Sequence, residues 1–152
     1  MTNPWNLGDR IKDRWEILKI LKGGMGVVYV IFDHKWSEVF AAKTFQDYAF
    51  HRNSRIADRF KQEAFSWIKL DVHPNVTRAR MIEEIDGKIF LFLEYVCGGD
   101  LSCLIGTPRL TQNPSEVVRL GIQFCDGMIR AVEKGIKYHR DIKPQNCLLT
   151  SS

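Results

Sequence analysis

Residues 139–146 could together transfer a phosphoryl group to a hydroxyl. They read His-Arg-Asp-Ile-Lys-Pro-Gln-Asn. At this spacing Asp141 could accept the hydroxyl proton, Lys143 could neutralise charge on the moving phosphoryl group, and Asn146 could bind a divalent metal ion. An isolated Arg-Asp pair is more often a solvated surface ion pair, so this segment alone leaves both interpretations open.

A second pair of charged residues lies upstream. Lys43 falls within an apolar run, residues 39–45, that predicts a strand. Glu63 lies beside the apolar stripe of a helix predicted over residues 54–70. A carboxylate next to an apolar stripe needs a cation, so we expect Glu63 to pair with Lys43. A lone lysine on a strand is otherwise usually solvated.

Glycines connect two strands predicted over residues 15–21 and 27–32. The connection reads Gly23-Gly24-Met25-Gly26. Glycine lets backbone amides approach a phosphate without an intervening Cβ atom. An ordinary hairpin turn is the alternative.

The remaining elements place these residues. Strands over 76–85 and 88–96 flank Asp86-Gly87, a strong hairpin signal. A short helix is predicted over 100–105 and a short strand over 147–149. A long helix begins at Pro114 after the N-cap Asn113, and Gly135 predicts its end. Its apolar stripe comprises Val118, Ile122, Cys125, Ile129 and Val132, with Val117, Phe124 and Met128 alongside.

All eight positions of residues 139–146 resemble the catalytic loop of serine/threonine protein kinases, and the resemblance extends over about residues 15–149. The glycine-rich connection, residues 23–29, resembles that of bacterial-type serine/threonine kinases. The resemblance implies an α+β fold. It has a five-stranded antiparallel N-lobe with one inserted helix, then the first helices and catalytic loop of an incomplete helical C-lobe. The expected partition is a leader over 1–14, the N-lobe over 15–96, and the hinge with a partial C-lobe over 97–152.

The resemblance also implies ATP and Mg²⁺ as cofactors and protein Ser/Thr hydroxyls as acceptors. Asp141, Lys143 and Asn146 would be catalytic, with Asn146 also the metal ligand. His139 would pack beneath the loop and form a hydrogen bond with the backbone. Arg140 would contact a phosphorylated residue of the activation loop, a segment of the family that is not among these 152 residues. The expected nucleotide-binding residues are Leu21, Gly23, Gly24, Met25, Gly26, Val28, Ala41, Lys43, Glu63, Leu93, Glu94, Val96 and Asp100. Leu21 departs from the family pattern, which has glycine at that position.

The D-F-G motif of the family is not among the 152 residues. We therefore expect the domain to be truncated after the catalytic loop and inactive by itself. The stripe of the long helix would normally pack on later helices, so its side chains should face water. A non-catalytic nucleotide-binding or pseudokinase-like interaction module is one alternative function. A small-molecule phosphotransferase with a kinase-like fold is another. Lys143 and Pro144, together with the hinge-like sequence of residues 93–101, favour a protein substrate instead.

Composition limits the partners. The net charge is +4, and the basic residues are scattered, which gives no argument for nucleic acid binding. The four cysteines, at 97, 103, 125 and 147, lack metal-ligand spacing and are interpreted as free thiols of a reducing compartment. No signal peptide or long apolar run is present. We expect a cytoplasmic location and no membrane segment in this chain.

Overall fold

The computed structural model describes residues 5–23, 26–45 and 54–150. They form two compact units. One comprises the residues up to Lys69 together with Arg78–Tyr95, and the other comprises Leu70–Thr77 and the residues from Val96 onward. The partition predicted from the sequence, with its leader, N-lobe and partial C-lobe, stays a prediction.

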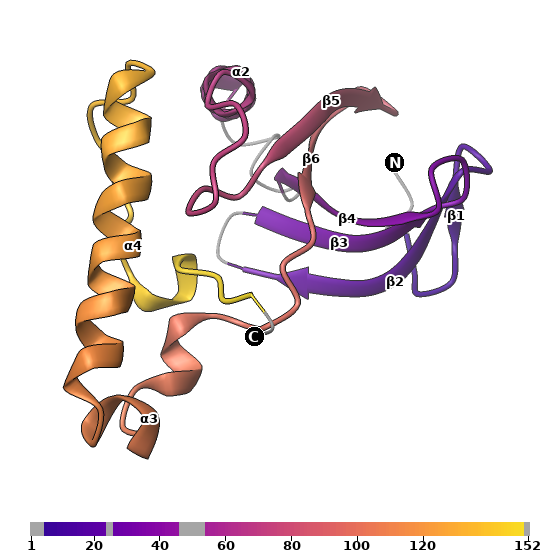
Figure 1. The fold of residues 1–152 in the computed structure, drawn as a ribbon. Coiled ribbons are helices and arrows are strands. Elements are labelled where there is room, and N and C mark those ends of the chain that lie inside the picture. Colours follow the sequence, from indigo (N-terminus) through magenta and orange to yellow (C-terminus); the bar gives the residue numbers. More distant parts are fainter. Residues whose placement is uncertain (1–4, 24–25, 46–53, 151–152) are drawn as a thin grey trace. The chain divides into compact units, whose positions relative to one another are not determined.

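The first unit is built on a six-stranded antiparallel sheet (Figure 1). In sheet order its strands are β1 (Arg10–Ile11), β2 (Trp15–Lys22), β3 (Gly26–Asp33), β4 (Glu38–Phe45), β6 (Lys88–Glu94) and β5 (Ala79–Ile85). The sequence predicts five strands. The sixth is β1, which lies in the expected leader and pairs with the start of β2.

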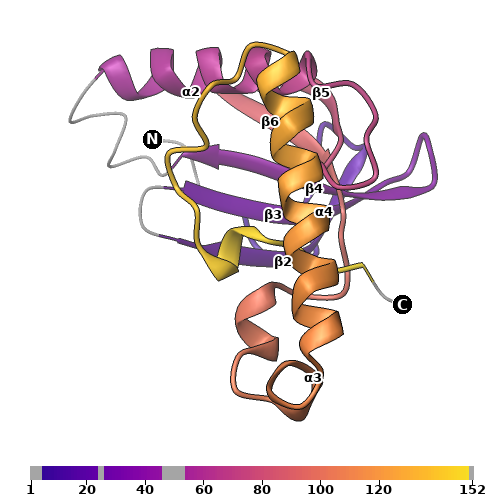
Figure 2. The same cartoon turned by 60° about the vertical axis from the view of Figure 1, so that its left-hand side comes forward.

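Side chains of β6 alternate between the two faces of the sheet. Phe90 and Phe92 join a large apolar cluster on one face. Leu91 and Leu93 join a second cluster on the other face, with Ala64 of α2 (Ser54–Ile68). Successive strand residues point to opposite faces of a sheet, so the apolar residues 90–93 contribute to the core on both faces. Figure 2 shows α2 lying along β5 and β6.

The predicted hairpin between β5 and β6 is present. Asp86 and Gly87 both have positive φ, 51° and 75°, as a two-residue turn of this kind requires. The first strand of the hairpin begins only at Ala79, three residues later than predicted, and Val76 instead forms an isolated bridge with His73.

A buried ion pair holds the start of β2 to the end of β3. Asp33 is 0% exposed and accepts hydrogen bonds from Arg14 at 2.7 and 3.0 Å and from Trp15 Nε1 at 2.9 Å. The backbone amides of Lys35 and Trp36 also donate to it. Burial raises the pKa of Asp33, but these hydrogen bonds outweigh burial and lower the pKa overall. The sequence analysis did not identify this pair.

The second unit is helical. Its elements are η1 (Leu101–Leu104), α3 (Pro108–Thr111), α4 (Pro114–Glu133) and η2 (Pro144–Asn146). The start of α4 is as predicted, because the Asn113 side chain accepts a hydrogen bond from the amide of Glu116 at 3.2 Å. The helix ends at Glu133, and Gly135, whose φ is 88°, follows the C-cap Lys134 as the predicted stop. Ile136 N donates back to Ala131 O at 2.9 Å, a Schellman-type stop.

Residues 70–77 pack against one side of α4. A Cβ atom on Gly127 would lie 2.4 Å from the carbonyl oxygen of Asn75, so only glycine allows this approach. His73 lies 3.6 Å from Asp126. The opposite side of α4 carries the exposed apolar stripe, as the sequence analysis expected.

The predicted strand over 147–149 is reduced to one bridge, between Asp100 and Leu148. A Cβ atom on Gly98 would lie 2.2 Å from the carbonyl oxygen of Leu149, so the two segments cross too closely for any other residue. The short predicted helix is a 3₁₀ helix, η1. None of the helices in the described ranges is both long and apolar enough to span a membrane.

Candidate functional site

Three predicted catalytic side chains converge within one loop of the second unit. Lys143 Nζ lies 2.8 Å from Asp141 Oδ2. Asn146 Nδ2 donates to Asp141 Oδ2 and to its carbonyl oxygen, both at 2.8 Å. Pro144 opens the short helix η2, whose single turn brings Asn146 back to Asp141. The loop therefore presents a carboxylate, an ammonium and a carboxamide together.

The charge state of Asp141 follows from these contacts. Hydrogen bonds from Lys143 and then Asn146 lower the pKa of Asp141 below its ordinary value. The carboxyl is therefore ionised at neutral pH, the state that can accept a hydroxyl proton.

The two residues before Asp141 differ in part from expectation. His139 Nδ1 accepts a long hydrogen bond from the amide of Asp141, 3.4 Å, which is the expected backbone contact. Its side chain is nevertheless exposed, so the expected packing beneath the loop is wrong for this structure. Arg140 is exposed and adopts φ 67°.

The predicted pair of Lys43 and Glu63 is present in the first unit. Lys43 Nζ on β4 lies 3.5 Å from Glu63 Oε1 on α2. The Glu63 side chain is 56% exposed, so burial does not enforce this pairing, contrary to the sequence argument. Lys43 Nζ also lies 5.6 Å from the ring centroid of Trp67. The sequence analysis missed this contact, although Trp67 follows Glu63 by one helical turn and could have been found from that spacing.

The predicted adenine-site residues of the first unit share one face of the sheet. Leu21 pairs with Val28, and Val28 pairs with Lys43, in adjacent strands. Cross-strand partners project to the same face. Ala41 lies two residues before Lys43 and pairs with Leu93, so it projects to the same face. The predicted roof therefore lies on the face that α2 covers.

The glycine connection is described only at its two ends. Gly23 N donates to Gly26 O at 3.0 Å, which closes the turn. A Cβ atom on Gly26 would lie 3.2 Å from the carbonyl oxygen of Thr44, so a larger residue is disfavoured there. Gly24 and Met25 lie outside the described residues.

The hinge residues divide between the units. Glu94 ends β6, and its carboxylate accepts from the amide of Arg78 at 2.8 Å. Val96 and Asp100 belong to the second unit. The Asp100 carboxylate caps η1, accepting from the amide and hydroxyl of Ser102. Its expected contact with ribose stays a prediction.

A magnesium ion fits Asn146 chemically. Its amide nitrogen donates to Asp141, so its amide oxygen, a ligand of the type that Mg²⁺ prefers, is the atom that would bind the ion. Within the described ranges, no three or more His, Cys, Asp or Glu side chains are grouped to hold a metal by themselves. Mg²⁺ commonly takes one or two protein oxygens and completes its shell with phosphates and water.

Comparisons with known proteins agree with this geometry. A family model described as protein kinase domain matches residues 16–152. A probable serine/threonine-protein kinase of Clostridium perfringens is 34% identical over 146 residues, which are 95% of this chain and 21% of that protein. The serine/threonine-protein kinase PrkC of Bacillus subtilis is 34% identical over 145 residues, which are 94% of this chain and 22% of that protein. The chain thus spans about a fifth of the length of these relatives.

Solved structures give the same fold. A double mutant of the Mycobacterium tuberculosis PknI kinase domain superposes with a TM-score of 0.77 at 22% identity. The match covers 99% of this chain and 58% of that one. At this identity the likeness shows the fold alone.

Proposed function

Because the chain belongs to the family of protein kinase domains, we propose that its residues bind ATP and serve the transfer of the γ-phosphate to protein Ser/Thr hydroxyls. The observation that carries the proposal is the loop in which Asp141, Lys143 and Asn146 meet at 2.8 Å. Phosphoryl transfer needs a proton acceptor, a cation and a metal ligand together, and this loop supplies all three.

Each side chain of the loop has a separate role. Asp141, with its lowered pKa, orients the acceptor hydroxyl and takes its proton. Lys143 stabilises negative charge on the transferred group, which is the main source of catalysis in such reactions. Asn146 offers its amide oxygen to Mg²⁺, which neutralises phosphate charge when bound.

The nucleotide contacts lie mainly in the first unit. Lys43, oriented by Glu63, would hold the α- and β-phosphates. The side chains of Val28 and Ala41 would form the apolar roof over adenine, and Leu93 would close the back of that pocket. The carbonyl of Glu94 and the amide of Val96 would bond the adenine edge. Gly23 and Gly26 would let backbone approach the phosphates.

We further propose that these 152 residues by themselves bind nucleotide without completing the transfer. The D-F-G motif, which supplies the second metal ligand in the family, is not among them. A non-catalytic nucleotide-binding module is the second candidate, and Leu21, 43% exposed where the family has glycine, favours it. The free thiols and this kinase assignment favour a cytoplasmic setting.

Phosphate transfer from radiolabelled ATP to a Ser/Thr peptide mixture tests the proposal. We expect no transfer by the 152-residue chain and measurable transfer by a chain that continues through D-F-G and A-P-E segments. In the extended chain, Asp141→Asn should lower the rate about 10²- to 10⁴-fold and leave ATP binding unchanged. Asp86→Asn is the matched control, because an Asn-Gly turn suits the same hairpin. An unimpaired Asp141→Asn enzyme would refute the assigned role.

A further inference from the structure

Trp67 of α2 contacts the lysine that is assigned to the phosphates. Lys43 Nζ lies over the indole, 5.6 Å from the ring centroid. Glu63, one helical turn earlier, places Oε1 3.5 Å from the same nitrogen. Residues four apart on a helix are neighbours on one face. The ammonium therefore has two partners on one helix, and the proposed function uses only the carboxylate.

The strength of the two contacts does not separate them. The Glu63 side chain is 56% exposed, and its distance from Lys43 is long for an ion pair. An exposed ion pair does little to hold two long side chains in one geometry. Indole is the side-chain ring that attracts cations most strongly, and such a contact is of similar size. The rigidity of each partner therefore decides which one fixes the ammonium.

The indole of Trp67 is held by the apolar cluster on the same face of the sheet. Trp67 packs against the cluster formed by Ala64, Leu91 and Leu93. Leu91 is the cross-strand partner of Lys43, so this cluster lies directly beside the lysine. Packing against the cluster restricts the ring, whereas the carboxylate one turn earlier is more than half exposed.

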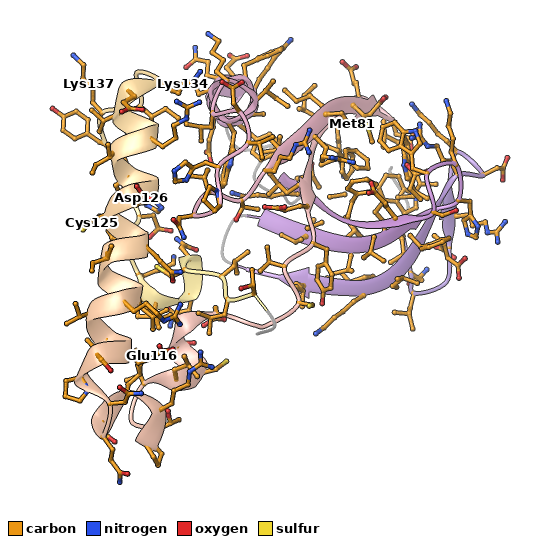
Figure 3. The ribbon with its side chains drawn as sticks, viewed as in Figure 1. Met81, Glu116, Cys125, Asp126, Lys134 and Lys137 are labelled. Atoms are coloured by element: carbon orange, nitrogen blue, oxygen red, sulfur yellow. The ribbon has the colours of Figure 1, made fainter. Side chains whose placement is uncertain are left out.

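Strand β5 contributes to the same support. Met81, labelled in Figure 3 on β5, packs on the large cluster of the opposite face. Ile82, the next residue, pairs with Leu91 and packs on the cluster that Trp67 contacts. Residues of β5, β6 and α2 together therefore support the indole, and its position is set by the fold of the first unit.

We propose that Trp67 is a positioning residue, which holds Lys43 for the phosphates of ATP and keeps its contact when the nucleotide is bound. This inference rests on the proposed function. Lysine carries three donors on a flexible stem of four carbons. A ring against one side of the ammonium restricts the stem and leaves the donors to oxygens of Glu63 and of phosphate. Restricting the stem before binding lowers the entropy cost of binding.

Calorimetric titrations with ATP and, separately, with adenosine test the effect on binding. Trp67→Leu keeps an apolar side chain on the cluster and removes the aromatic ring. It should weaken ATP binding about two- to fivefold, the size of a partly exposed contact between a cation and a ring. Adenosine binding should stay unchanged, because adenosine carries no phosphate. Trp67→Phe, whose ring attracts cations less strongly, should have an intermediate ATP affinity.

Trp36→Leu is the matched control. Trp36 also lies against a cation, with the guanidinium carbon of Arg14 4.6 Å from its ring centroid. It precedes β4, whereas Lys43 lies near the other end of that strand. The control should bind both ligands as the natural chain does.

The other outcomes of these titrations are distinct. Equal losses of ATP and adenosine affinity in Trp67→Leu would indicate a merely structural role and overturn the proposal. Unchanged or tighter ATP binding would overturn it as well, because the ring would then not assist Lys43. A natural chain that binds no ATP would refute the proposed function itself, together with the inference that rests on it.

Proton–carbon NMR of the natural chain tests the contact without relying on the folding of any variant. Nuclei over the face of an aromatic ring are shielded, so the ε-methylene resonance of Lys43 should lie upfield of those of other lysines. Lys43→Ala identifies this resonance by its loss. The upfield shift should persist when ATP is added. An ordinary shift in the natural chain, or a return to one with ATP, would overturn the proposal.

Discussion

Replacing Asp33 by asparagine should destabilise the chain more than any surface change of charge. The Asp33 carboxylate is 0% exposed, whereas the Arg14 side chain retains 23% exposure. Arg14 is stacked between Trp15 and Trp36, with its guanidinium carbon 4.7 and 4.6 Å from the ring centroids. The substitution leaves this cation without its carboxylate.

The magnitude follows from the burial of the pair. Breaking a buried ion pair by removing one partner costs roughly 3–5 kcal/mol. Arg14 is partly exposed and asparagine keeps one acceptor oxygen, so we expect the lower end, about 3 kcal/mol. For a chain of this length the melting temperature should fall by about 10 °C. Urea unfolding followed by tryptophan fluorescence measures the change.

Two further variants make this prediction refutable. Glu38→Gln removes the exposed ion pair with Arg80, whose atoms are 2.8 Å apart with Glu38 51% exposed, and should cost less than about 1 kcal/mol. Arg14→Met combined with Asp33→Asn should be more stable than Asp33→Asn alone, because it removes the unpaired cation. The reasoning fails if Asp33→Asn costs no more than Glu38→Gln.

Two other outcomes concern α4. Gly127→Ala should destabilise by about 1–3 kcal/mol, because its methyl group would meet Asn75 O at 2.4 Å. Gly121→Ala, which meets nothing within 4 Å, should stabilise by up to about 1 kcal/mol; equal effects in urea unfolding would contradict this. Hydrogen bonds from Arg119 and Arg109 lower the pKa of Glu116 to about 2 from 4.5. Its stabilising effect should be complete above pH 4.5 and be lost as the pH falls toward 2. The melting temperatures of the natural chain and Glu116→Gln should therefore differ above pH 4.5 and converge in acid.

The parts of the fold that were predictable carry local signals. Helix α4 begins at Pro114 after its N-cap Asn113 and ends at Glu133, two residues before Gly135; these start and stop signals act on the neighbouring backbone. The Asp86-Gly87 turn is similarly self-contained. The short strand β1 has no periodicity to detect, because two residues cannot show one. The burial of Asp33 depends on its ion pair with Arg14, which lies between β1 and β2, 19 residues earlier in the sequence. No sequence pattern near Asp33 predicts this partner.

The candidate site shows the same division. The loop that joins Asp141, Lys143 and Asn146 is local in sequence, and its convergence follows from a short turn. The pair of Lys43 and Glu63 was predictable from the kinase resemblance, whereas the exposure of Glu63 depends on how α2 packs. The Asp100 carboxylate caps η1, whereas the kinase resemblance gives the same carboxylate a contact with ribose. No sequence pattern distinguished these two roles of Asp100.

Calorimetric titration of the 152-residue chain with ATP tests the central claim most directly. We expect weak binding that depends little on magnesium, because Asn146 is the only metal ligand assigned. Lys43→Ala should weaken binding about tenfold or more, since it removes the cation that we propose for the phosphates. Lys35→Ala, an exposed lysine of the β3–β4 turn, should leave binding unchanged. Tight, strongly magnesium-dependent binding that survives Lys43→Ala would contradict the account.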